Sequence, residues 1–126
     1  MTRVHQWRTI QLAGGEAEQC VMEILETSVF TRQVQQSLTD EEYRVLQLGL
    51  VKRPDEGAVI RGSGGLRKLR WSIGGRGKRG GLRIIYYWAV ARDQLLMLFL
   101  YPKGKKEDLT PEQLKRLKAF VEVEYP

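Results

Sequence analysis

The chain has very little of the residues on which disulfides, zinc sites and histidine-based nucleases depend. Its 126 residues include one histidine, His5, and one cysteine, Cys20. A single cysteine cannot form an internal disulfide, and one cysteine with one histidine cannot make a zinc site. A cleavage mechanism that uses two histidines is excluded for the same reason. We expect a protein of the reducing cytoplasm that uses no metal and no other cofactor.

Long hydrophobic runs are also missing. No apolar stretch reaches the ~18 residues of a membrane-spanning helix. The N-terminal stretch MTRVHQWRTIQLAGG has no continuous apolar segment of the kind found in a secretory signal. We therefore expect no membrane association. The length suits one domain with a single core, and 42% hydrophobic with 29% charged residues is an ordinary globular composition.

Acidic residues are absent from one part of the chain. From Gly57 to Arg92 there are nine arginines or lysines and no aspartate or glutamate, so this segment carries +9 and the rest of the chain −3. Two strand-like runs, LRKLRW and GLRIIYYW, are joined there by a loop of glycines and cations at 74–81. Such a cationic hairpin suits binding of a polyanion, because phosphate contacts supply most non-specific affinity for nucleic acids.

Helix signals stand at two places in the chain. Thr39 precedes three acidic residues and can form a capping box with Glu42, and Pro54 ends the helix that follows. A short helix over 30–37 would precede it and complete a helical hairpin. Near the C-terminus, the run Thr110-Pro111-Glu112-Gln113 gives a last helix the same capping pattern, with proline at the first helical position.

Strand signals account for most of the remaining chain. The sequence predicts strands over 22–30, 66–73, 82–91 and 95–101. The last of these, LLMLFLY, is apolar on both faces, which is typical of a central strand covered by helices. We expect an α+β fold: a small antiparallel or mixed sheet of about four strands, with the helical hairpin and the C-terminal helix packed on one face. The cations would then lie on the open face.

The first 21 residues look unlike the remainder. Gly14-Gly15 indicates a break before the strand that begins at Met22. We interpret residues 1–21 as an N-terminal extension and 22–126 as the domain. Two alternatives stay open for the extension: a segment outside the domain, or an ordinary strand or helix packed on it.

Five motifs follow one another in the chain: Gly62-Ser63-Gly64-Gly65-Leu66-Arg67-Lys68, Lys78-Arg79-Gly80-Gly81, Arg83-Ile84-Ile85-Tyr86-Tyr87, Tyr101-Pro102-Lys103 and Glu107-Asp108-Leu109-Thr110. As a set and in this order, they resemble the RelE/ParE superfamily of toxins from bacterial toxin–antitoxin operons, and within it the RelE-like, HigB-type branch. The resemblance runs from about Met22 to the C-terminus. Any one motif alone would be weak.

The resemblance implies a RelE-like fold and a ribosome-dependent mRNA endonuclease, which cuts message in the ribosomal A site and stops translation. It also implies a cognate antitoxin, HigA-like and carrying a helix-turn-helix, that covers the basic surface. Operator DNA would be contacted only through that antitoxin. Besides the antitoxin, the expected partners are therefore the ribosome and its mRNA.

RNA can be cleaved by attack of its own 2′-hydroxyl on the adjacent phosphate, provided that protons are moved and charge on the phosphate is neutralised. The composition leaves cationic side chains for this task. Alternation along the strand places Lys68 and Arg70 on one face, with Leu69 and Trp71 turned inward. The resemblance matches both cations, and Arg83, to residues that contact the scissile phosphate. We interpret the catalytic set as Lys68, Arg70, Arg83, Tyr101 and Lys103.

Within that set, Lys103 would bind the phosphate and Tyr101 would stack on a base or transfer a proton. RelE-type toxins have a catalytic tyrosine near the position that Leu109 occupies here. The proton-transfer role therefore stays open among Tyr101, Tyr86 and Lys103. Tyr86 and Tyr87 point to opposite faces of their strand, so at most one of them lines the site.

A second group of cations is interpreted as RNA-binding without a part in the chemistry. For Arg67, alternation predicts the face opposite Lys68 unless a bulge intervenes. The glycine-rich loop can approach an RNA backbone closely, although a solvated loop is the plain alternative. Trp71 and Trp88 are expected in the core. The RNA-binding group consists of Arg67, Arg76, Lys78, Arg79, Lys105 and Lys106.

Two other functions stay open. A ParE-like toxin would inhibit gyrase with the same fold and without nuclease chemistry, although the cationic set has no obvious use there. A non-catalytic nucleic-acid-binding module would use the same charges for affinity alone, and loss of any one of them would then weaken binding evenly.

Overall fold

The computed structural model describes residues 4–11, 21–72, 81–102 and 109–125. Within these ranges the elements are β1 (Val4–Gln11), β2 (Val21–Thr27), α1 (Ser28–Ser37), α2 (Asp40–Lys52), β3 (Ala58–Val59), β4 (Leu66–Trp71), β5 (Leu82–Ala89), the 3-10 helix η1 (Val90–Arg92), β6 (Gln94–Pro102) and α3 (Pro111–Glu124).

The strands form one mixed sheet in the order β1-β2-β6-β5-β4-β3. Strand β2 runs parallel to β6, and every other neighbouring pair is antiparallel. The fold is therefore α+β, as the sequence predicts, but the sheet has six strands where about four were expected. The two additional strands are its edges: β1 at one side and the two-residue β3 at the other.

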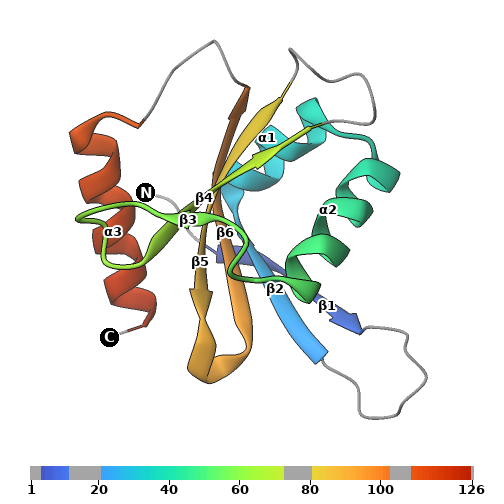
Figure 1. Ribbon diagram of the computed structural model, residues 1–126, viewed down its shortest axis with the longest axis horizontal. Coiled ribbons are helices and arrows are strands. Elements are labelled where there is room, and N and C mark those ends of the chain that lie inside the picture. Colours follow the sequence, from blue (N-terminus) through green and yellow to red (C-terminus); the bar gives the residue numbers. More distant parts are fainter. Residues whose placement is uncertain (1–3, 12–20, 73–80, 103–108, 126) are drawn as a thin grey trace.

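Helices cover both faces of the sheet, so the prediction that all of them pack on one face was wrong (Figure 1). Helices α1 and α2 pack on one side, hereafter the α1/α2 face, and α3 packs on the other, hereafter the α3 face. The reason lies in the central strand β6. It buries Leu95 and Met97 on the α1/α2 face and Leu96 and Leu98 on the α3 face, and two apolar faces require two covers. None of the described helices is long and apolar enough to cross a membrane.

The helix starts follow the capping signals of the sequence. The side chains of Thr39 and Glu42 form a reciprocal capping box at α2, and Thr110 does the same with Gln113 at α3. Helix α1 begins two residues earlier than predicted, at Ser28, because the hydroxyl of Thr27 accepts a hydrogen bond from the Phe30 backbone N–H at 3.1 Å.

The N-terminal segment contributes a strand. Strand β1 pairs antiparallel with β2 from Val4 opposite Thr27 to Gln11 opposite Val21. Of the two alternatives left open by the sequence, this part of residues 1–21 matches the strand that packs on the domain. Ile24 and Thr27, which predicted a strand after Met22, belong to β2, the pairing partner of β1. Val29, the third β-branched residue of that prediction, lies in α1.

One irregularity in β6 decides which way its C-terminal end faces. Ile85 of β5 lies opposite Phe99, whereas the next residue, Tyr86, lies opposite Met97, so Leu98 is an extra residue in a β-bulge. Its carbonyl oxygen accepts a hydrogen bond of 3.2 Å from the buried Thr27 hydroxyl. The bulge turns Phe99 and Tyr101 onto the α3 face, whereas strict alternation from Met97 would place them on the other.

Candidate nucleic-acid interface

Three predicted site residues form a row across three strands. Arg70 of β4 lies directly opposite Arg83 of β5, and Arg83 lies opposite Tyr101 of β6. Directly paired residues project from the same side of a sheet. The next row on that side contains Lys68, opposite Ile85. Alternation thus places Lys68 and Arg70 on one face as predicted, and pairing adds Arg83 and Tyr101 to it. This is the α3 face, so the prediction that the cations lie on a face without helices was wrong.

The paired arginines concentrate positive charge. In the part of the chain that the structure describes, no carboxylate forms an ion pair with Arg70 or Arg83; the ion pairs seen there join Arg53 to Asp55 and Glu56. Arg70 is exposed and Arg83 is half-buried. Like charges directly opposite one another destabilise a sheet. An anion bound between the two guanidinium groups would offset that cost, since arginine can grip two phosphate oxygens at once.

A groove lies beside the row. It has a volume of about 380 Å³ and runs between the edge strand β3, the sheet and the start of α3. Its floor includes Lys68, Ile85 and Tyr101, and its outer wall includes Leu109 and Leu114. Most of these side chains are apolar. The groove therefore joins an apolar surface to a cationic one on the same side of the sheet.

Tyr101 is more buried than a stacking residue would be. Only 5% of it is exposed, and its ring centroid lies 5.9 Å from that of Phe99. A ring so enclosed offers no free face to a base. The hydroxyl oxygen of Tyr101 is buried as well, so proton transfer by this phenol stays a prediction.

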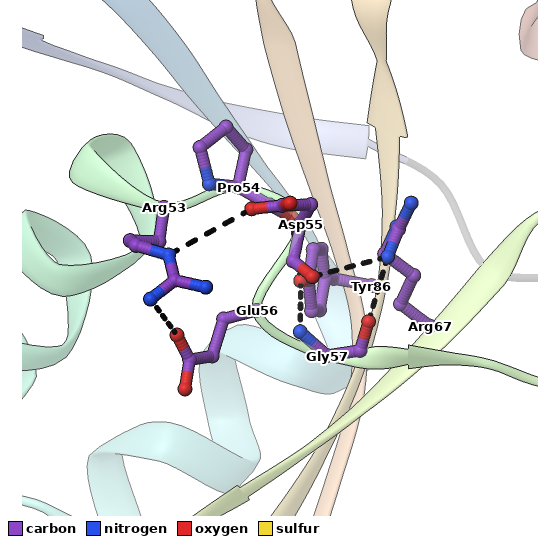
Figure 2. A network of polar contacts seen from close by, with 7 residues as sticks. All are labelled: Arg53, Pro54, Asp55, Glu56, Gly57, Arg67 and Tyr86. Atoms are coloured by element: carbon purple, nitrogen blue, oxygen red, sulfur yellow. Dashed lines mark hydrogen bonds and ion pairs between the residues drawn. The ribbon is translucent and has the colours of Figure 1, made fainter.

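Tyr86 faces away from the row, toward the α1/α2 face, and its hydroxyl is committed to the backbone (Figure 2). The hydroxyl donates to the Pro54 carbonyl oxygen at 2.6 Å and accepts from the Gly57 N–H at 2.9 Å. Burial raises the pKa of Tyr86, opposed by the Gly57 hydrogen bond and by Arg67. A Cβ at Gly57 would lie 2.9 Å from the Tyr86 ring, so this close approach needs glycine. Tyr86 is therefore no candidate for proton transfer at the row.

Arg67 belongs to the same backbone network rather than to the cationic row. It lies opposite Tyr86, on the face away from Lys68, as alternation predicts. Its Nη1 donates to the carbonyl oxygens of Gly57 at 2.7 Å and Asp55 at 3.2 Å (Figure 2). These bonds fix the 53–57 turn against the sheet and hence the position of β3, one wall of the groove. Contact of Arg67 with RNA stays a prediction.

The remaining predicted site residues lie outside the described residues. They are Arg76, Lys78 and Arg79 of the glycine-rich loop, and Lys103, Lys105 and Lys106 after β6. Trp71 and Trp88, by contrast, pack against the core of the α1/α2 face as predicted. Among the described residues no three His, Cys, Asp or Glu side chains come together as ligands for a metal.

The groove and the bulge were not predicted. In the sequence, Leu114, Leu117, Phe120 and Val121 indicate an ordinary buried stripe of the last helix, and nothing near Leu98 marks a bulge. One sequence pattern could have predicted a helix on the α3 face: β6 is apolar on both sides, so both faces of the sheet need a cover. No protein-family model matches the chain, so its function has to be inferred from the residues of the row and the groove.

Proposed function

We propose that this protein is a RelE-like toxin that cleaves ribosome-bound mRNA, and that Arg70 and Arg83 hold the phosphate at the cut. The observation that supports this most directly is the pairing of these two arginines, opposite each other and without a described carboxylate partner. A polyanion is the ligand that such a pair would favour. The motif resemblance supplies the class of reaction.

In this mechanism the RNA supplies its own nucleophile. The 2′-oxygen forms a bond to phosphorus while the bond from phosphorus to the 5′-oxygen breaks, which leaves a 2′,3′-cyclic phosphate and a 5′-hydroxyl. Arg83 and Arg70 stabilise the charge that builds on the phosphate oxygens between these states. The proton lost by the 2′-hydroxyl and the one gained by the 5′-oxygen are assigned to Tyr101 and Lys103, the candidates that remain.

The same surface fits the proposed partners. A cytoplasmic antitoxin with a helix-turn-helix would neutralise the toxin by covering the arginine row with acidic or apolar side chains, and would itself contact operator DNA. The ribosome would contribute by holding the message in the A site with its backbone bent for in-line attack. Without the ribosome, cleavage of free RNA is expected to be slow.

The test is cleavage of mRNA on programmed ribosomes by Arg83→Ala. Removing one donor to a developing oxyanion costs about 10²–10³-fold in rate, and we expect a loss of that size together with loss of growth arrest. Arg83→Lys keeps the charge but cannot grip two oxygens, so it should recover only part of the rate. Arg44→Ala is the matched control, because it removes an equal charge from the exposed surface of α2.

The alternatives give different results. A gyrase inhibitor would block DNA supercoiling and leave ribosome-bound message intact, whereas a non-catalytic binding module would yield no cut product at any concentration. Arg83→Ala with an undiminished rate on ribosomes would contradict the proposed role of the arginine pair.

A further inference from the structure

Helix α3 is held firmly at one end only. At its C-terminal end Val121 is buried, and the Tyr125 hydroxyl donates to the Gln94 side chain at 2.9 Å. The Tyr125 ring lies 5.4 Å from that of Tyr87 and 5.1 Å from the guanidinium carbon of Arg92. Several contacts thus anchor this end to the start of β6 and the end of β5.

The N-terminal half of α3 packs less closely on the sheet. Leu114 and Leu117 are only half-buried there, as is Leu109 just before the helix. Beside the 380 Å³ groove, a smaller one of about 170 Å³ lies between Phe99, Leu109 and Leu117. The apolar side chains at this end of α3 therefore line open space that is accessible to a ligand from outside.

The larger groove has the dimensions and lining of a small-ligand site. Pockets for such ligands usually hold about 300–1,000 Å³, so about 380 Å³ suits a single compact group. Most of its lining is apolar, including Ile60, Ile85 and Leu114, and favours a flat apolar group over one that needs many hydrogen bonds. A planar ring that slides between the sheet and the helix would bury both of its faces.

The distance between the groove and the arginine pair matches one nucleotide. Lys68 lines the groove, and Arg70 lies two residues further along β4 on the same face. Two residues of a strand span about 7 Å, which is the scale of the separation between a phosphate and its own base. A ligand with a flat apolar ring and an anion at that spacing would occupy both places at once.

We propose that this groove is a binding site for one nucleobase of single-stranded RNA whose phosphate lies on Arg70 and Arg83. The inference rests on the proposed function for the class of ligand, and adds to it the place where a base binds. An apolar side chain of a protein partner would fit the groove, but it would leave the adjacent arginines without an anion. Because the walls carry few polar groups, the site accepts all four bases and prefers the larger purines for their area.

The test uses two probes of equal charge: a mixed-sequence RNA hexamer and a hexamer of abasic ribose phosphates, both labelled and titrated without ribosomes. Ala58 is exposed and lies opposite Lys68, so its side chain points to the groove side of β3. Ala58→Phe should fill the groove from that wall. Stacking of a base is worth about 1–3 kcal/mol, so we expect Kd for the RNA hexamer to rise about tenfold, and Kd for the abasic hexamer to change less than about twofold.

Two further variants protect the result against a folding artefact. Leu114→Phe fills the groove from the helix side and should reproduce the selective loss. Val45→Phe adds the same ring to α2 on the other side of the sheet, where Val45 is 59% exposed, and should change neither Kd. Equal losses for both probes, no loss for either, or no binding of the RNA hexamer by the wild type would each overturn the inference.

The outcome is independent of the cleavage assay. If Ala58→Phe selectively weakens binding of the RNA hexamer while ribosome-bound message is never cut, the base site stands and the nuclease proposal fails. If message is cut and the two hexamers bind alike, the nuclease proposal stands and the base site fails.

Discussion

The two faces of the sheet are built differently. The α1/α2 face is closed: its core includes Phe30, Leu46 and Ile84, each with no exposed surface. The α3 face has fewer fully buried side chains, and much of its apolar surface, such as Phe99, Leu114 and Phe120, is only partly covered. A closed face contributes most to stability, because stabilisation scales with the apolar area removed from water. The α3 face keeps the groove and the arginine row partly exposed, and the proposed binding would depend on that surface.

The charges follow the same division. Two charged groups near the α1/α2 face are tied to neighbouring groups: Glu26 accepts hydrogen bonds from the hydroxyls of Tyr43 and Thr31, and Arg67 donates to two backbone carbonyl oxygens. On the α3 face two arginines are placed opposite each other at a cost to the fold. Stability and ligand affinity should therefore respond to different substitutions.

The largest difference is expected between two leucines. Leu46→Ala should lower the free energy of unfolding by about 2–5 kcal/mol, because it leaves a cavity in a closed core. Leu114→Ala should cost less than about 1.5 kcal/mol, since Leu114 is half-buried beside a groove and loses fewer contacts. Urea denaturation of both variants measures the difference; equal losses would mean that the two faces contribute alike.

A second, smaller difference concerns two neighbouring tyrosines. Tyr86→Phe should cost about 1–3 kcal/mol, because it leaves the Gly57 N–H and the Pro54 carbonyl oxygen without their partner. Tyr87→Phe, on the α3 face, should stay within about 0.5 kcal/mol. Hydrogen exchange at Gly57 should speed up only in the first variant, and an unchanged rate there would mean that Tyr86 does not hold the turn.

The arginine pair should give an effect of opposite sign. Arg70→Gln removes one of two like charges and should raise the free energy of unfolding by about 0.2–1 kcal/mol at low salt, with a smaller gain as salt is added. Arg44→Gln, which removes a charge from exposed α2, should give no comparable gain. Destabilisation by Arg70→Gln would show that the pair is not repulsive.

The smallest effect is a pH dependence of stability that appears only in alkaline solution. Burial raises the pKa of Tyr86 above 10.0, so the folded state retains this proton where the unfolded state loses it. The resulting stabilisation is complete below about pH 10 and declines as pH rises through the folded-state pKa. The stability gap between wild type and Tyr86→Phe should therefore narrow from pH 9 to pH 11. A gap that widens over this range would contradict the direction of the shift.

Local features of the fold could be predicted from the sequence. Both capping boxes involve residues three apart, and alternation over four residues of β4 separates Lys68 from Arg67. Such patterns depend on neighbours in the chain, and the structure has them where the sequence predicts them.

Features that depend on distant partners could not be predicted in the same way. The bulge at Leu98 is stabilised by Thr27, which lies 71 residues earlier in the chain, and it is the bulge that brings Tyr101 to the arginines. The face that α3 covers depends on the apolar residues of β6. The groove exists because the N-terminal half of α3 does not pack closely on the sheet. The distance between a helix and a sheet depends on packing, and no short sequence motif determines it.

The parallel pairing of β2 with β6 sets the order in which the protein can be completed. The pairs run from Glu23 opposite Gln94 to Glu26 opposite Met97. Strand β2 is therefore paired with β6 only after about 70 further residues have been synthesised. Contacts of such high sequence separation form slowly, and they cannot form on a ribosome until most of the chain has emerged. Until then the row lacks β6, the strand that carries Tyr101, so a nascent chain can have the β4–β5 arginine pair but neither the complete row nor the groove beside it.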